Sequence, residues 1–259
     1  MRSILVPADP RPSRDERIES ALTVARATNG HVTVQVDVPI TRYVSTDAFG
    51  GAALMREALE AARQDAEEKA AQISARLSSQ DVPFDIEHSD EEAVESLVAG
   101  ARLADLIVIS FDDYCLNEVA VTARCPVLAI PAGHALLRLD QPAVVAWDGG
   151  HESANAMRAA LPLLRLAESV HVVRVTEKEN AFPPSDALCY LSRHDVHAEL
   201  ADCAPAGSIG VTLENAARRL NAGLIVMGAF GHSRLREMIL GGVTKHFLTH
   251  SKVPLLLAH

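Results

Sequence analysis

Three glycines with the spacing G-x2-G-x9-G, Gly228, Gly231 and Gly241, are the residues of this chain best suited to bind an anion. They follow the apolar run 224–227, which predicts a buried strand, and they precede 245–250, which predicts a helix. Glycines let a backbone approach an anion closely, and the first N–H groups of a helix donate hydrogen bonds to it. The spacing differs from the P-loop pattern G-x4-G-K-[ST] and from the dinucleotide pattern G-x-G-x-x-G. The sequence therefore predicts a phosphate-binding loop of another kind.

Polar side chains near this loop could extend such a site. Ser233 offers a hydroxyl, and the guanidinium of Arg234 or Arg236 could form a two-pronged pair with phosphate, although an exposed loop arginine is often only solvated. Thr244 offers a second hydroxyl. Asp148 ends another apolar run, where it could bind a ligand or cap the turn made by the two glycines that follow it.

Composition limits the classes of function. The chain has 259 residues, of which 48% are hydrophobic and 22% charged, so a packed core is expected. The formal net charge of −10 gives no chain-wide attraction to nucleic acid or to an anionic membrane. We expect a cytoplasmic protein, because no apolar run is long enough for a membrane helix or a signal peptide. The four cysteines show no C-x-x-C pairing and are expected to be free thiols.

The two halves of the chain repeat each other. Three similarities occur in the same order: 2–9 with 142–148, 104–110 with 222–228, and 124–130 with 252–257. Three ordered matches indicate a duplication. We predict one unit at 1–138 and a second at 142–259.

Apolar runs that predict strands alternate with segments that predict helices. In the second unit the predicted strands are 143–147, 170–175, 196–200, 224–227 and 253–257, and the predicted helices are 153–167, 186–192, 209–220 after a Ser208 cap, and 245–250. In the first unit 52–77 predicts a long helix, since it has no glycine or proline. Alternating strands and helices predict an α/β fold, a parallel sheet with helices on both faces.

These features together resemble a tandem universal stress protein. Such proteins contain an open five-stranded parallel sheet with helices on both faces, an adenine nucleotide alpha hydrolase-like fold. Their ATP-binding members carry G-x2-G-x9-G-[ST] after the fourth strand. The resemblance covers nearly the whole chain in two copies, and it implies two tandem five-stranded units.

The resemblance also implies a nucleotide site in the second unit. Asp148 matches the residue that binds ribose or adenine, and Val173 or Val175 matches the strand position whose backbone contacts adenine. Gly242 stands where the family usually has Ser or Thr, so one hydroxyl contact to phosphate is missing. The implied nucleotide-binding residues are Asp148, Val173, Val175, Gly228, Gly231, Ser233, Arg234, Gly241, Gly242, Val243 and Thr244.

The first unit lacks the loop. Ser110 and Pro126 are 16 positions apart, whereas their counterparts Gly228 and Pro254 are 26 apart, so ten residues are missing. The segment 111–120 contains three acidic residues, which would repel phosphate, and no glycine. We therefore predict one nucleotide site per chain, with a structural role for Asp9.

The leading hypothesis is a stress-response or regulatory protein that binds ATP, or AMP or ADP, with or without Mg²⁺. An unknown protein partner would read the bound state. One alternative is an interaction protein without a nucleotide. A minor alternative is an ATP pyrophosphatase-type adenylating enzyme, because 148–153 is similar to the S-G-G-x-D-S loop of those enzymes, with Asp in place of the first Ser and Glu in place of the Asp. Without a Walker lysine or a nucleophile elbow, we expect no enzyme beyond slow ATP hydrolysis.

The resemblance further implies how the units meet. The last strands, 126–130 and 254–257, are expected to pair antiparallel and form an internal pseudo-dimer, which would also protect two apolar edges. Two chains could associate further as a homodimer. His246 and His250 share a helix face but have no third ligand in the sequence, so no metal site is expected.

Overall fold

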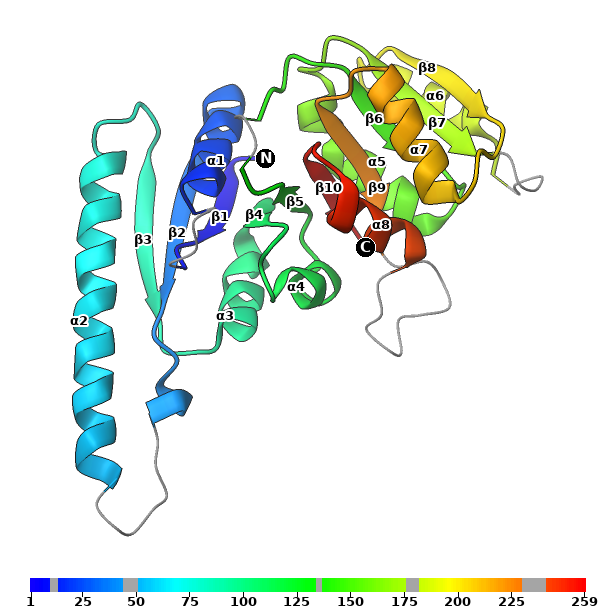
Figure 1. Cartoon of the computed structure of the whole chain (residues 1–259). Helices are drawn as coiled ribbons and strands as arrows, with labels where there is room; N and C mark the ends of the chain where they lie inside the picture. Colours follow the sequence, from blue (N-terminus) through cyan, green and yellow to red (C-terminus); the bar gives the residue numbers. More distant parts are fainter. Residues whose placement is uncertain (10–13, 44–50, 134–136, 176–181, 230–240) are drawn as a thin grey trace.

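A computed structural model describes the chain except for residues 10–13, 44–50, 134–136, 176–181 and 230–240 (Figure 1). The described strands form one ten-stranded sheet in the order β3-β2-β1-β4-β5-β10-β9-β6-β7-β8. The strands are β1 Ser3–Pro7, β2 His31–Asp37, β3 Phe84–Ser89, β4 Leu106–Ser110, β5 Val127–Ile130, β6 Ala143–Ala146, β7 Val170–Val175, β8 Ala198–Cys203, β9 Leu224–Gly228 and β10 Leu255–Ala258. Each half contributes five parallel strands, as the sequence predicted, and the strand order is the same in both halves.

Helices cover both faces of this sheet (Figure 1). The α-helices are α1 Arg14–Thr28, α2 Gly51–Leu77, α3 Ala93–Gly100, α4 Leu116–Thr122, α5 His151–Leu164, α6 Pro184–Arg193, α7 Ile209–Arg219 and α8 Gly242–His250, with short 3₁₀ turns η1 Ile40–Tyr43 and η2 Ala101–Leu103. One apolar cluster packs α1, α2, α5 and α6 against the sheet, and the other packs α3, α4, α7 and α8 against the opposite face. The core is therefore a pair of layers shared by both halves.

The two halves meet through their last strands. β5 and β10 are antiparallel, with Leu255 opposite Ala129, Leu256 opposite Leu128 and Leu257 opposite Val127. This confirms the antiparallel pairing that the resemblance implied for these apolar edges. It also leaves neither strand as an exposed edge, where unpaired N–H and C=O groups invite association. The unit boundaries at 138 and 142 remain a prediction.

Equivalent backbone hydrogen bonds define which residues of the two halves correspond. The Ala8 N–H donates to the Gln35 carbonyl at 2.7 Å, and the Trp147 N–H donates to the Val173 carbonyl at 2.9 Å. Ala8 therefore corresponds to Trp147 and Gln35 to Val173. The next residue, Asp9, then corresponds to Asp148. This correspondence lets each position of the candidate site be compared with its counterpart.

Most predicted elements are present with shifted ends. The long helix is found as α2, and Ser208 caps α7 by accepting a hydrogen bond from the Val211 N–H at 3.3 Å. β8 begins at Ala198 rather than at Val196, because the Val196 N–H bonds back to the Leu191 carbonyl and closes the turn after α6. α5 begins two residues earlier than predicted and ends at Leu164, short of the predicted 167.

Candidate functional site

The candidate site lies at the carboxyl edge of the second half of the sheet. β6, β7 and β9 are neighbours and parallel, so their carboxyl ends meet at one edge. Asp148 follows β6, Val175 ends β7 and Gly228 ends β9. α8 then begins at Gly242, beyond the segment that connects it to β9. Four of the predicted site positions therefore come from elements that converge on the same edge.

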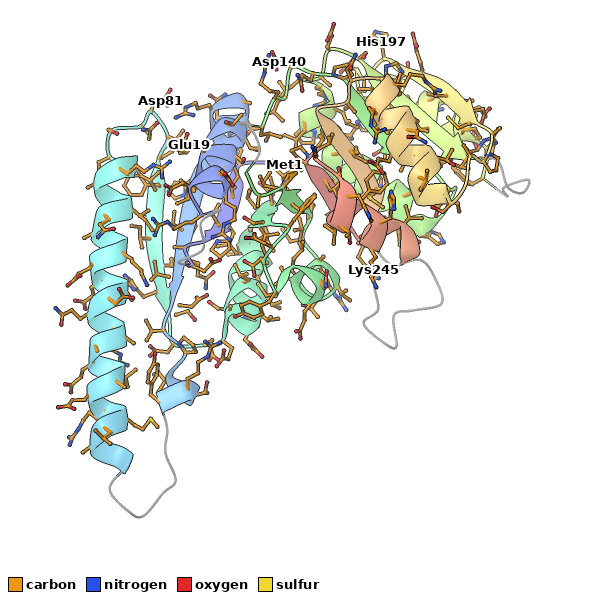
Figure 2. The ribbon with its side chains drawn as sticks, in the orientation of Figure 1. Met1, Glu19, Asp81, Asp140, His197 and Lys245 are labelled. Atoms are coloured by element: carbon orange, nitrogen blue, oxygen red, sulfur yellow. The ribbon has the colours of Figure 1, made fainter. Side chains whose placement is uncertain are left out.

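The amino terminus of α8 supplies the hydrogen-bond donors. Gly241 is the extended residue before the helix, and the Lys245 N–H donates to its carbonyl at 2.9 Å. The N–H groups that precede this bond, from Gly242 to Thr244, belong to the first helical turn, whose donors have no acceptor within the helix. They carry the positive end of the helix dipole. Lys245 projects from the same turn (Figure 2).

Among the described residues, none packs closely against Gly241 and Gly242 at the start of α8. A Cβ atom built on Gly241 or Gly242 would meet no atom of the described residues within 4 Å. Gly242 is exposed and Val243 is half-buried, whereas Thr244 is only 3% exposed. Because Thr244 packs inward, the groups of this turn most accessible to a ligand are those of the backbone.

Asp148 closes the turn between β6 and α5. Its Oδ1 accepts hydrogen bonds from the Gly150 N–H at 2.8 Å and from the Ser153 hydroxyl at 2.7 Å. The turn interpretation of this residue is therefore correct. The side chain is also exposed, so the ribose interpretation stays a prediction beside it.

The two valines differ in their surroundings. Val173 is fully buried, and its carbonyl already accepts the Trp147 N–H. Val175 is the half-buried last residue of β7, opposite Cys203 of β8. Of the two, Val175 is nearer the carboxyl edge where a ligand would lie.

Gly228 has a packing reason to be glycine. A Cβ atom at this position would come within 2.7 Å of the Glu152 Cβ and within 2.8 Å of the Ser153 nitrogen. The amino end of α5 therefore lies directly against the end of β9, and any side chain would push the two apart. Gly231, Ser233 and Arg234 lie outside the described residues, as does Arg236, and their predicted roles remain predictions.

The first half is built differently at the same edge. Asp9, the counterpart of Asp148, accepts a hydrogen bond from the Arg17 Nη1 at 2.8 Å. Arg17 is completely buried and also pairs with Asp113 at 3.3 Å. This ion pair agrees with the expected structural role of Asp9. Sequence analysis missed Arg17, although its place on the apolar face shared with Ala21 and Val24 was a signal that it points inward.

Asp37 was also missed. It ends β2 at the counterpart of Val175, so an acid replaces an apolar residue. The Ser96 hydroxyl donates to its Oδ1 at 2.5 Å. Burial raises the pKa of Asp37 from 3.8 to about 6, the Ser96 hydrogen bond opposes this, and the negative charges of Asp9, Asp113 and Glu92 add to it. The first half therefore presents a different chemistry where the second half has valine.

The described part of the chain gives no evidence for a metal site or for a membrane-spanning helix. It contains no group of three His, Cys, Asp or Glu residues placed to hold a metal ion. His246 and His250 stack with ring centroids 4.7 Å apart, and His246 bonds to Glu214 at 2.8 Å. None of the described helices has the length and apolar character that a membrane span requires.

Comparison with known proteins shows what the chain is similar to. The profile of the universal stress protein family matches residues 205–259, which run from the approach to α7 to the end of β10. A universal stress protein from Archaeoglobus fulgidus DSM 4304 has the same fold, with a TM-score of 0.74, 15% identity, and coverage of 99% of this chain and 97% of that one. A protein of unknown function from Pseudomonas aeruginosa PAO1 has a TM-score of 0.62 and 15% identity, with coverage of 100% and 92%. No curated protein matches the chain.

Residues 205–259 are thus similar to the universal stress protein family, and the whole chain has the fold of a solved universal stress protein. A universal stress protein solved in complex with cAMP is 21% identical over 46% of this chain. Its TM-score of 0.35 is too low to support an argument about ligands.

Proposed function

We propose that the chain binds an adenine nucleotide, ATP or AMP or ADP, through its second half alone, and that binding serves regulation rather than efficient catalysis. One observation carries the proposal. The segment that matches the family, 205–259, contains the glycines and the amino end of α8, and this helix begins at the sheet edge where Asp148 lies.

Of the parts of a nucleotide, the phosphates are the ones that the amino end of α8 would bind. Its first-turn N–H groups lack acceptors within the helix, and the helix dipole favours an anion at this end. Hydrogen bonds to a charged group contribute about 1.5–3 kcal/mol each. The chain has a net charge of −10, so attraction to a polyanion has to come from such a local site.

The nucleoside would lie toward β6 and β7. The Asp148 carboxylate is held by Gly150 and Ser153, so a ribose hydroxyl would meet an acceptor that is already oriented. The backbone at Val175 lies at the same edge and would face adenine. We assign no catalytic residue to this site.

The first half offers no equivalent. Asp9 is committed to Arg17, Asp37 replaces the second valine, and Asp112 and Asp113 follow β4 where the second half has its glycines. Carboxylates at these positions repel phosphate. A single site per chain follows from this difference.

Equilibrium dialysis with labelled ATP, with and without Mg²⁺, tests the proposal. Asp148→Asn and Asp9→Asn form a matched pair, since the two aspartates occupy corresponding positions. We expect one bound nucleotide per chain, roughly tenfold weaker binding for Asp148→Asn through loss of a charged acceptor, and unchanged binding for Asp9→Asn. Gly231→Val should also abolish binding.

The chain carries its own reporter. Trp147 is the one tryptophan of the sequence and directly precedes Asp148, so its fluorescence should change when ATP binds. Equal weakening by both aspartate variants would contradict a site confined to the second half. No binding at millimolar ATP would instead favour an interaction protein without a nucleotide.

A further inference from the structure

The first half contains a cavity of about 350 Å³ between the carboxyl edge of the sheet and α2. We call it the α2 pocket. Ala8, Val36 and Val38 line it from the sheet, and Ala62 and Ala66 line it from α2. The amino-terminal part of α2 extends past the strand ends here (Figure 1). The volume is at the lower end of the range for small-molecule sites.

The second half shows what fits such a space. Trp147 corresponds to Ala8, and its indole is buried on the same face of the sheet, only 4% exposed. The Phe182 ring lies beside it, with centroids 6.3 Å apart. A large aromatic side chain thus occupies the position that Ala8, with a single methyl group, leaves open in the first half. A ligand with an aromatic ring would supply the missing contacts.

Most of the charged residues that line the α2 pocket are already paired. Lys69 pairs with Asp65 one turn earlier on α2, and the Arg42 guanidinium pairs with Glu92 at 3.1 Å. Asp9 is held by Arg17. These ion pairs hold the charged side chains around the pocket in place and balance their charges without a ligand.

Asp37 is the exception. The hydrogen bond that it accepts from the Ser96 hydroxyl brings no positive charge. Burial raises the pKa of the Asp37 carboxyl to about 6, and the negative charges of Asp9, Asp113 and Glu92 add to that rise. At neutral pH this carboxylate is ionised, half-buried and among other acids. A cation at the rim would relieve that repulsion.

We propose that the α2 pocket binds a small organic cation with an aromatic body, whose ring packs against Ala8 and whose ammonium group pairs with Asp37. The ring takes the place that the Trp147 indole has in the second half. Tyr43 also lines the pocket and offers a second aromatic surface to the ring or to the cation. The site is separate from the nucleotide site of the second half.

Isothermal titration calorimetry on the full chain tests this with two probes. Tryptamine carries an indole and an ammonium group, and tryptophol is the same molecule with a hydroxyl in place of the ammonium. We expect one tryptamine per chain and roughly tenfold weaker binding of tryptophol, which lacks the charge-assisted hydrogen bond. Asp37→Asn should bring the two probes to similar affinities.

Ala8→Trp is the blocking variant, since it places in the first half the residue found in the second. It should abolish tryptamine binding while keeping the far-UV circular dichroism spectrum and ATP binding of the parent chain. If Ala8→Trp fails to fold, Ala62→Leu fills the pocket from the α2 side and should give the same loss. Because ATP binding is measured in parallel, failure of this proposal and failure of the nucleotide proposal can be distinguished.

The pH dependence adds a readout that nonspecific ring stacking would not show. Tryptamine should bind more tightly as the pH rises from 5 to 7, because Asp37 ionises in that range. The other charged groups near the site are Asp9, Asp65, Arg42, Lys69, Arg17, Asp113 and Glu92. Equal affinity of the two probes, tryptamine binding that survives Ala8→Trp, or no binding of tryptamine at millimolar concentration would overturn the proposal.

Discussion

Two glycines at the candidate site differ in whether neighbouring atoms leave room for a side chain. Gly228 is fixed by the close approach of α5, whereas Gly242 has no described neighbour within 4 Å of its missing Cβ. We therefore predict that Gly242→Ser strengthens ATP binding roughly three- to tenfold, because the added hydroxyl can donate a hydrogen bond worth about 0.5–1.5 kcal/mol to phosphate. Equilibrium dialysis of ATP against the variant and the parent chain measures the change.

Gly228→Ser is the matched control for that change. Its Cβ would lie 2.7 Å from the Glu152 Cβ, so the variant should unfold at lower denaturant concentration than the parent. Gly242→Ser should leave the unfolding midpoint nearly unchanged. If Gly242→Ser left the ATP affinity unaltered, the first turn of α8 would not face the phosphates.

Asp37 should make stability depend on pH in an unusual direction for an acid. Its pKa is raised from 3.8 to about 6 in the folded chain, so the folded state binds more protons than the unfolded state between those values. This contribution to the free energy of unfolding therefore falls as pH rises from about 4 to about 6. We predict that Asp37→Asn is more stable than the parent at pH 7, by about 1–2 kcal/mol.

Guanidinium denaturation at pH 4.5 and at pH 7 checks this. The advantage of Asp37→Asn should be large at pH 7 and should shrink at pH 4.5, where the parent carboxyl is mostly protonated. Asn keeps an oxygen that can accept the Ser96 hydroxyl, so the variant preserves that bond. An Asp37→Asn variant less stable than the parent at pH 7 would show that the carboxylate is compensated in the folded chain.

At the scale of elements, local patterns predicted most of the fold. Apolar runs such as 106–109 became fully buried strands, and the glycine-free stretch 52–77 became α2. The Ser208 cap was also predictable, because a serine before a helix satisfies an N–H group of the first turn. Element ends were less predictable. The Val253 N–H bonds to the Ser251 hydroxyl, so β10 begins later, at Leu255.

Within the candidate site, only interactions between residues close together in the sequence could be predicted. Asp148 and its turn follow from the residues directly after it. The Arg17 pair with Asp113 joins residues 96 positions apart, and no local pattern indicates which acid a buried arginine will meet. The α2 pocket was likewise missed, because it depends on comparing Ala8 with Trp147 across the two halves.

At the scale of the whole molecule, β5 and β10 make the two halves one sheet. Their contacting residues are fully buried, and the apolar clusters on both faces contain residues from both halves. Separating the halves would expose apolar surface on both strands at a cost of about 25 cal/mol per Å². Neither half is therefore expected to unfold while the other stays intact.

We predict a single cooperative unfolding transition, tested with a variant in one half and a probe in the other. Arg17→Ala removes the cation that pairs with the buried Asp113 and the partly exposed Asp9, which should cost about 3–5 kcal/mol. The midpoint from Trp147 fluorescence, which reports the second half, should fall by as much as the midpoint from circular dichroism. Arg26→Ala, which breaks the exposed Arg26–Asp81 pair, is the control and should shift neither midpoint appreciably. A Trp147 midpoint that stayed in place while the circular dichroism curve split into two steps would mean that the halves fold independently and that the β5–β10 pairing contributes little to their coupling.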